Sequence, residues 1–385
     1  MLRSLYAGIS GLRSHQTMLD VTGNNIANVN TVGFKGSSVQ FQESLAQLVQ
    51  NSTLPQANAG GSNPAQVGLG VQISAISTNF ASGSTQATGV PTDLMIAGDG
   101  FFMVSAGGEN LYTRNGAFAF DAAGRLVTAD GALVQGWTAQ NGVINPGQGV
   151  GAITLPVGAI APGRATTAAS ATGNLPSDTA VGDSIVRDLQ VFDADGAARQ
   201  LQLTFTRTAT GWDVTDGTST TSLAFVDGEQ AGASSIVSDG VAVDLSALTG
   251  FAELSTAALG EQNGAAAGTL VAYALTDDGS LVGTFSNGDT AVLARLALAG
   301  FVNPGGLEKA GSSHYRPSTN SGEPVIGAAG QDGLGGIVSG ALEMSNVDLS
   351  QEFTNLIVAQ RGFQANARII TTSDEVLQEL TNLKR

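Results

Sequence analysis

The N-terminal stretch MLRSLYAGISGLRSHQTMLDVTGNNIA, residues 1–27, has the pattern of an amphipathic helix. Its apolar residues are spaced alternately three and four apart, which is the spacing of a coiled-coil stripe. The stripe consists of Leu5, Ile9, Leu12, Leu19 and Ile26, and Gln16 and Gly23 occupy two of its positions. The sequence therefore predicts a helix that has to bury one narrow face against a partner.

A matching stripe lies at the other end of the chain. It consists of Leu349, Phe353, Leu356, Phe363, Ile370 and Leu377, with Gln360 and Asp374 as its polar interruptions. Two helices with one apolar stripe each can bury these stripes against each other, so we predict that residues 1–30 and 345–385 pair as a coiled coil. Because polar residues and glycines weaken this seam, we expect it to hold only when many neighbouring copies share it.

The sequence between the two ends has a different period. Short runs such as Gln200-Leu201-Gln202-Leu203-Thr204-Phe205-Thr206 alternate apolar and polar residues, and turn sequences such as Asp193-Ala194-Asp195-Gly196 separate them. The predicted fold class is mostly β with terminal α-helices. Helix at both ends with sheet between them implies a discontinuous, multidomain protein.

Changes in composition suggest where the domains begin and end. Residues 37–70 are rich in Gln, Asn, Gly and Pro, and we interpret residues 31–70 and 330–344 as an extended connector. Residues 163–280 hold 15 acidic and 4 basic residues, which is the composition of a separate, outer acidic β-domain. An inner β-domain is then expected at residues 71–162 and 281–329.

The charge of the chain limits its partners. The 385 residues include 32 acidic residues and 16 lysines and arginines, so the net charge is −16. This charge opposes binding to nucleic acid or to an anionic membrane. No window reaches the ~18 apolar residues of a membrane-spanning helix, and polar residues between Gly8 and Arg13 interrupt the apolar run of a secretory signal. We expect neither membrane insertion nor a cleaved signal peptide.

The chemistry needed for catalysis is sparse. Cysteine is absent, and only His15 and His314 could act as bases near neutral pH. His15 lies off the apolar stripe of its helix, which is typical of a structural histidine, and His314 follows Gly311, Ser312 and Ser313 in a turn-like setting. We therefore predict that the protein is not an enzyme.

Possible ligand sites also have a simpler structural interpretation. The acidic pairs Asp193/Asp195 and Asp277/Asp278 each precede a glycine between alternating runs, which is the composition of a hairpin turn. The stretch Gly98-Asp99-Gly100 is not followed by the Lys-Ser/Thr of a phosphate-binding loop. We predict no metal and no cofactor.

One longer motif carries a resemblance. Residues 24–35 read NNIANVNTVGFK, and this stretch resembles the N-terminal signature of flagellar rod and hook proteins at Asn24, Asn25, Asn28, Thr31, Gly33, Phe34 and Lys35. Residues 93–102 and 112–118 look like the inner β-domain of the same family. Residues 345–349 and 359–367 resemble the C-terminal helix of its hook proteins. Together these matches cover about half of the chain, at its ends and in the inner domain.

The resemblance implies a structural subunit of the bacterial flagellum. Hook proteins form a homopolymer, a curved hollow tube that acts as a universal joint and transmits motor torque to the filament. The implied partners are a rod protein at the proximal end, hook-cap and hook–filament junction proteins at the distal end, and the flagellar export apparatus. The implied location is the hook and basal body at the extracellular cell surface, reached without a cleaved signal peptide.

Two alternatives remain open at this point. A distal rod protein of the same family would share the helical ends, although the acidic insertion and the sequence QRGFQAN at residues 360–366 favour the hook. A secreted β-rich adhesin would share the acidic β middle but would have no need of two matching helical stripes. Straight or curved tubes in electron micrographs would separate rod from hook.

Overall fold

The computed structural model describes residues 2–55, 60–140, 142–156, 158, 160–232 and 235–382. Two compact units make up the chain: one holds Met1–Leu155, Leu275–Leu281 and Leu293–Arg385, and the other holds Pro156–Ala274 and Val282–Val292. The predicted mostly β fold with a helix at each end is confirmed. The finer predicted domain scheme stays a prediction, and its residues 1, 56–59, 141, 157, 159, 233–234 and 383–385 lie outside the described ones.

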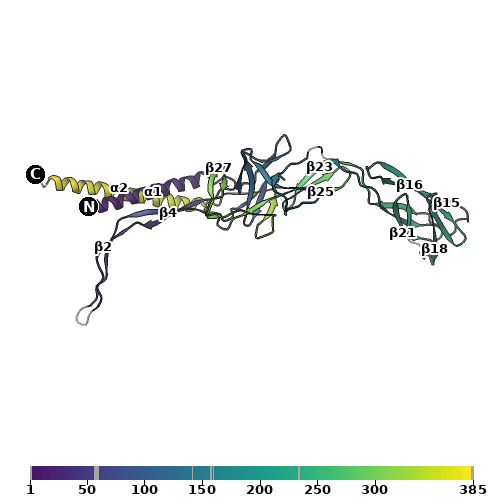
Figure 1. Cartoon of the computed structure of the whole chain (residues 1–385), viewed down its shortest axis with the longest axis horizontal. Coiled ribbons are helices and arrows are strands. Elements are labelled where there is room, and N and C mark those ends of the chain that lie inside the picture. Colours follow the sequence, from purple (N-terminus) through teal and green to yellow (C-terminus); the bar gives the residue numbers. More distant parts are fainter. Residues whose placement is uncertain are drawn as a thin grey trace. The chain divides into compact units, whose positions relative to one another are not determined.

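The first unit contains both helices. Helix α1 spans Leu2–Ala27 and helix α2 spans Leu349–Asn382, and the two lie side by side (Figure 1). Asp348 begins α2, because its carboxylate accepts hydrogen bonds from the backbone N–H groups of Ser350 and Gln351 at 2.8 and 3.2 Å. These two N–H groups have no partner within the helix, so the acidic cap stabilises its first turn.

Small residues bring the two helices close together. A Cβ added to Gly11 would lie 2.7 Å from Oδ1 of Asn366, and one added to Gly362 would lie 2.5 Å from the His15 ring. Gly8, Gly11 and Ser14 are buried on this face of α1. His15 is therefore a packed structural histidine that covers Gly362.

The contact differs from the predicted leucine seam. Leu5, Leu12, Leu19 and Ile26 are only half-buried, and Ile9 is exposed. On α2, Leu356, Phe363, Ile370 and Leu377 are half-buried, whereas Leu349 and Phe353 are exposed. The reason is steric: the glycines allow the backbones to approach, and Ile370 of the predicted seam packs against Gly8 rather than against a leucine.

The predicted connector is organised as paired strands rather than as chain without structure of its own. Strand β1 (Ser37–Glu43) pairs with β4 (Val71–Thr78), and β2 (Ala46–Gln50) pairs with β3 (Ala65–Gly68), all antiparallel. The β1–β4 ribbon contacts α1, where Ser10 accepts a hydrogen bond from the N–H of Val71 at 3.2 Å. Residues 330–344 likewise contain two short paired strands.

The β part of the first unit is built around a mainly antiparallel sheet. Its central path runs β25-β11-β7-β8-β28-β27, and β7 (Phe101–Ala106) begins with four fully buried residues. The remaining strands and one 3₁₀ turn are β5 Thr85–Ala87, β6 Leu94–Ala97, β8 Glu109–Thr113, β9 Phe118–Phe120, β10 Leu126–Thr128, β11 Leu133–Thr138, β12 Gly151–Ala152, β26 Leu298–Gly300, η1 Pro304–Gly306, β27 Glu308–Gly311, β28 His314–Arg316, β29 Val325–Gly327, β30 Gly336–Ser339 and β31 Ala341–Glu343.

The second unit contains a two-sheet core. One sheet has the order β15-β16-β17-β18-β19 and the other the order β20-β21-β14-β22. The strands of these two sheets are β14 Ala168–Asn174, β15 Ser184–Phe192, β16 Ala198–Arg207, β17 Gly211–Thr215, β18 Thr220–Val226, β19 Glu229–Gln230, β20 Ser235–Ser238, β21 Val241–Thr249 and β22 Ala258–Gln262. The other strands are β13 Ile160–Ala161, β23 Gly268–Leu275, β24 Ser280–Phe285 and β25 Thr290–Leu296, and the last three each have residues in both units.

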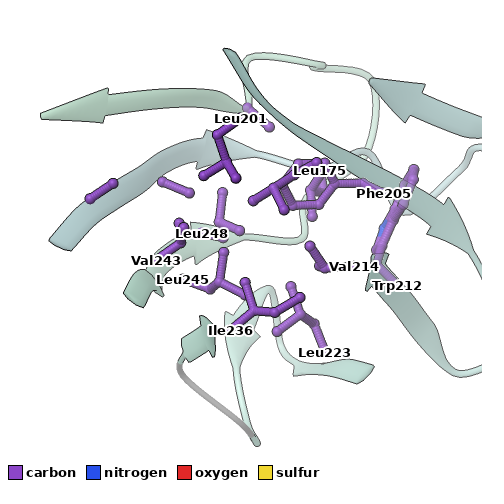
Figure 2. Packing of buried hydrophobic residues seen from close by; sticks show 14 of the residues in the cluster. Leu175, Leu201, Phe205, Trp212, Val214, Leu223, Ile236, Val243, Leu245 and Leu248 are labelled. Atoms are coloured by element: carbon purple, nitrogen blue, oxygen red, sulfur yellow. The ribbon is translucent and has the colours of Figure 1, made fainter. Parts of the chain in front are cut away.

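Alternating side chains fill the space between these two sheets. Leu201, Leu203 and Phe205 of β16 are buried, as the period of two in residues 200–206 predicts, and they belong to the same core cluster as Val243 and Leu245 of β21. Figure 2 shows Leu201, Phe205, Val243 and Leu245 in this cluster. The predicted turns are also present. Gly196 has φ +78° and its N–H bonds to the carbonyl of Asp193 at 3.1 Å, and Gly279 has φ +77° in the second turn.

The close helix contact can be tested by replacing two glycines, one at a time, with leucine. Gly362→Leu should lower the melting temperature of the helical signal, because overpacking costs about 1–3 kcal/mol. Gly23→Leu should raise it, because a Cβ there meets nothing within 4 Å and leucine favours helix by about 1 kcal/mol over glycine. Circular dichroism measures both, and a higher melting temperature for Gly362→Leu would contradict the contact.

Candidate functional site

Three charged side chains are buried together where the helix pair joins the β part of the first unit. Lys35, Arg114 and Glu343 are 0%, 2% and 0% exposed. The Lys35 Nζ lies 2.6 Å from Oε1 of Glu343, and Nη1 of Arg114 lies 3.5 Å from Oε2 of the same carboxylate. One carboxylate thus binds segments from the start, the middle and the end of the chain.

A left-handed residue brings Lys35 into this position. Gly33 has φ +66°, and its N–H donates to the carbonyl of Glu343 at 2.7 Å. A Cβ at residue 33 would lie 2.6 Å from the backbone nitrogen of Asn115. Only glycine fits both the conformation and the space, which gives a physical reason for this residue of the motif.

Hydrogen bonds to the backbone complete the buried cluster. Lys35 Nζ donates to the carbonyl of Ala81 at 2.8 Å, and the N–H of Gly83 donates to Glu343 Oε1 at 2.9 Å. Asn346 accepts from the N–H of Gly36 at 2.9 Å and donates to the same Ala81 carbonyl at 3.0 Å. The segment after α1 and the segment before α2 are therefore fastened to one loop.

The cluster holds two basic groups and one acid. Burial lowers the pKa of Lys35 more than the hydrogen bond and charge of Glu343 raise it. Burial likewise lowers the pKa of Arg114. The Glu343 carboxylate is therefore the group on which both cations depend, because an unpaired buried charge is strongly unfavourable.

The other residues of the family-like motif divide into two groups. Asn25 is buried and exchanges two hydrogen bonds with the backbone of Ser37, at 2.8 and 3.0 Å. Asn24, Asn28, Thr31 and Phe34 instead line a cavity of about 340 Å³ with the β27–β28 turn. The structure thus brings Gly33, Lys35 and Asn25 into the junction and leaves the remaining motif residues at its edge.

Sequence reasoning missed Glu343 and the pairing role of Arg114. Their partners lie far away in sequence: Lys35 and Glu343 are 308 residues apart. One signal was available, because Glu343 is the single charged residue between Asp332 and Asp348. A lone acid in an apolar and glycine-rich stretch indicates a buried charge with a distant partner.

The remaining candidates for chemistry have structural settings. His314 is buried and its Nε2 lies 2.8 Å from Oδ2 of Asp130. Burial would raise the pKa of Asp130, but hydrogen bonds from Thr128 and His314 lower it. Gly98 and Gly100 have φ +120° and +127° in the turn between β6 and β7, so the Gly98-Asp99-Gly100 stretch reverses the chain.

Both helices leave large apolar side chains in water. On α2 these side chains form two rows outside the contact with α1: Leu349, Phe353 and Ile357 in one, and Val358, Val376 and Leu380 in the other. Ile369 is also partly exposed, but it lies beside Gly8 of α1. On α1, Tyr6 is 67% exposed. No helix in the described part of the chain is long and apolar enough to cross a bilayer.

Three segments of the chain match known protein families. Residues 5–35 match the family "Flagella basal body rod protein", residues 95–172 match "Flagellar hook protein FlgE/F/G D1 domain", and residues 338–383 match "Flagellar basal body rod FlgEFG protein C-terminal". The buried Lys35, Arg114 and Glu343 come one from each of these three segments.

Relatives match the chain over its whole length. The flagellar hook proteins FlgE of Borreliella burgdorferi and Treponema pallidum are 37% and 36% identical, with 100% of both chains covered. The flagellar basal-body rod protein FlgG of Bacillus subtilis is 36% identical with the same coverage. A crystal structure of Helicobacter pylori hook protein FlgE2 covers 67% of this chain and 100% of its own, at 14% identity and TM-score 0.48.

The chain belongs to the family of flagellar hook and basal-body rod proteins. Within that family it is a structural subunit of the flagellar hook.

Removing the acid of the buried ion cluster should destabilise the fold more than removing its lysine. Glu343→Gln leaves two buried cations without a carboxylate and should lower the free energy of unfolding by about 3–5 kcal/mol. Lys35→Met leaves the Arg114–Glu343 pair and should cost about 1–2 kcal/mol. Denaturant unfolding of both variants measures the difference, and an equal loss would contradict the charge imbalance.

The pH dependence of Glu343→Gln provides a second check. In this variant Lys35 is more stable without its proton, so its folded pKa lies further below that of the unfolded chain. The unfolded state then binds more protons between the two pKa values, and stability rises with pH in that interval. The stability deficit of Glu343→Gln should therefore shrink as the solution becomes alkaline.

Proposed function

We propose that copies of this chain polymerise through their terminal helices into a curved hollow tube that transmits motor torque to the filament as a universal joint. The observation that carries the proposal is the two-sided apolar surface of α2. One side of this helix contacts α1, and the two exposed rows described above flank that contact. A helix with apolar side chains beyond its one intramolecular partner is expected to bind further helices.

The seam residues have a defined role in this proposal. Leu5, Leu12, Leu19, Ile26, Leu356, Phe363, Ile370 and Leu377 border the contact within one chain. Ile9, Leu349 and Phe353 are exposed and would complete their burial against neighbouring copies. The polymer would thus bury the apolar surface that one copy cannot cover.

A second surface supports the same proposal. The hairpin of β2 and β3 extends away from the helix pair (Figure 1). Residues 44–70 contain no charged residue, and Leu45, Leu48, Val49 and Leu54 are exposed there. An isolated two-stranded hairpin is marginal in water, so this one is expected to pack against another copy.

The remaining parts of the proposal follow from membership of the family. The expected partners are a rod protein at the proximal end, hook-cap and hook–filament junction proteins at the distal end, and the flagellar export apparatus. The expected location is the hook and basal body at the extracellular cell surface. A purely structural role without catalysis fits the absence of cysteine and the structural settings of His15 and His314.

A straight assembly of the rod type is the alternative to the proposed curved tube. The observation in its favour is the full-length similarity to the Bacillus subtilis rod protein. The two candidates differ in the shape of the assembly, because a rod is straight and a universal joint has to bend.

Electron microscopy of the purified, concentrated protein tests the proposed function. Curved tubes are expected for a hook subunit and straight tubes for a rod subunit, and a protein that stays monomeric at high concentration would overturn both. Ile357→Asp should abolish the tubes, because it places a charge in an exposed apolar row. Thr372→Asp adds the same charge at an exposed position of α2 between the two rows and should still assemble.

A further inference from the structure

A second cavity, in the β part of the first unit, has no role in the interactions described so far. Its volume is about 410 Å³, which is enough for one large side chain. Phe80, Phe101 and Phe301 line it, and Phe101 is buried at its base. Apolar surface continues outward from it, because Val302 is 90% exposed and Val325 is 53% exposed. Such an open aromatic cavity is typical of an anchor site in a protein interface.

The charged residues around the cavity favour a ligand of one charge sign. Asp99 and Asp332 line it and are exposed, and among the residues that the structure describes neither forms an ion pair. Arg114 also lines the cavity, but its guanidinium lies over the Phe101 ring at 5.2 Å and 3.5 Å from Glu343. The charge of Asp99 also acts on this guanidinium and raises its pKa. Two exposed carboxylates beside one buried guanidinium favour a further basic group next to an apolar or aromatic one.

The chain itself carries a segment of this kind. Within the described ranges, the exposed arginines that form neither an ion pair nor a hydrogen bond all lie on the helices: Arg3, Arg13, Arg361 and Arg368. Only those of α1 flank an exposed aromatic ring, because Tyr6 lies three residues after Arg3 and seven before Arg13. These spacings place all three side chains on one face of the helix.

The Tyr6 of the same copy cannot fill the cavity. After α1 ends, the chain reaches the β part at Lys35, which lies eight residues beyond Ala27 and pairs with Glu343. Tyr6 lies 21 residues before Ala27, which is about 30 Å along the helix axis at 1.5 Å per residue. A second copy of the chain is therefore required.

We propose that this cavity receives Tyr6 of a second copy, and that the flanking Arg3 and Arg13 pair with Asp99 and Asp332. The inference rests on the proposed polymer and adds a specific contact to it. The aromatic ring would bury its surface against three phenylalanines, and the arginines would fix its orientation. This contact would join the helix of one subunit to the β part of another.

The anchor is tested by the critical concentration for assembly of the full chain. Tyr6→Ala should raise it about tenfold or more, as expected for an aromatic hot spot. Tyr6→Phe retains the ring and should stay within about threefold of the parent. If the parent forms tubes and Tyr6→Ala assembles at the same concentration, the proposed contact is wrong while the proposed function stands.

Charge reversal tests the pairing independently. Asp99→Arg with Asp332→Arg, and Arg3→Glu with Arg13→Glu, should each raise the critical concentration, and combining the four changes should recover much of the loss. Glu261→Arg, in the second unit, is the matched control and should have no effect. Failure of the combined variant to improve on either pair of changes would overturn the pairing.

Crosslinking gives a direct reading, because the chain contains no cysteine. A chain with Arg3→Cys and Val302→Cys should form disulfide-linked copies on oxidation of the assembled protein, and either single variant should not form this ladder of linked copies. Absence of the ladder in intact tubes would contradict the contact. If the parent makes no tubes, the proposed function fails. Sedimentation of the parent and the Tyr6 variants then tests the contact, because Tyr6→Ala should weaken self-association and Tyr6→Phe should not.

Discussion

The first unit depends on one buried carboxylate. The Glu343 carboxylate pairs with Lys35, faces Arg114 and accepts a hydrogen bond from the N–H of Gly83, and the backbone carbonyl of Glu343 accepts one from the N–H of Gly33. These groups come from the end of the N-terminal helix, the β sheet, a loop and the strand that leads to the C-terminal helix. Both helices are therefore anchored to the sheet at the end where α1 stops and α2 starts. Along the rest of their length they are held mainly by each other and by the β1–β4 ribbon.

The helix pair shows how a chain can combine a stable contact with a surface left for other copies. Gly8, Gly11 and Gly362 bring the backbones together, so the contact within one copy needs few large side chains. Several larger residues, such as Phe353 and Ile357, then remain exposed. A conventional leucine seam would have buried those side chains inside each copy and left little apolar surface for assembly.

The sequence predicted what depends on local period and missed what depends on distant contacts. The terminal helices, the alternation in residues 200–206 and the turns at Gly196 and Gly279 follow from spacing alone. The fully buried residues of α1 were not identified, because large apolar residues dominate a periodicity argument whereas Gly8, Gly11 and Ser14 are among the buried ones. The connector strands escaped notice because their Gln, Ser and Thr side chains give little apolar alternation. Glu343 could not be paired without knowing which segments meet.

The second unit is an insertion within a continuous framework. The chain enters it after Leu155 and has returned to the first unit for good by Leu293, so the helices and the buried ion cluster are formed by residues outside it. Its length and composition can therefore change during evolution without altering the residues that join the helices to the sheet. A motile bacterium could in this way vary one part of each subunit while keeping the architecture of the assembly. Divergence among related chains is thus expected to concentrate between these two crossing points.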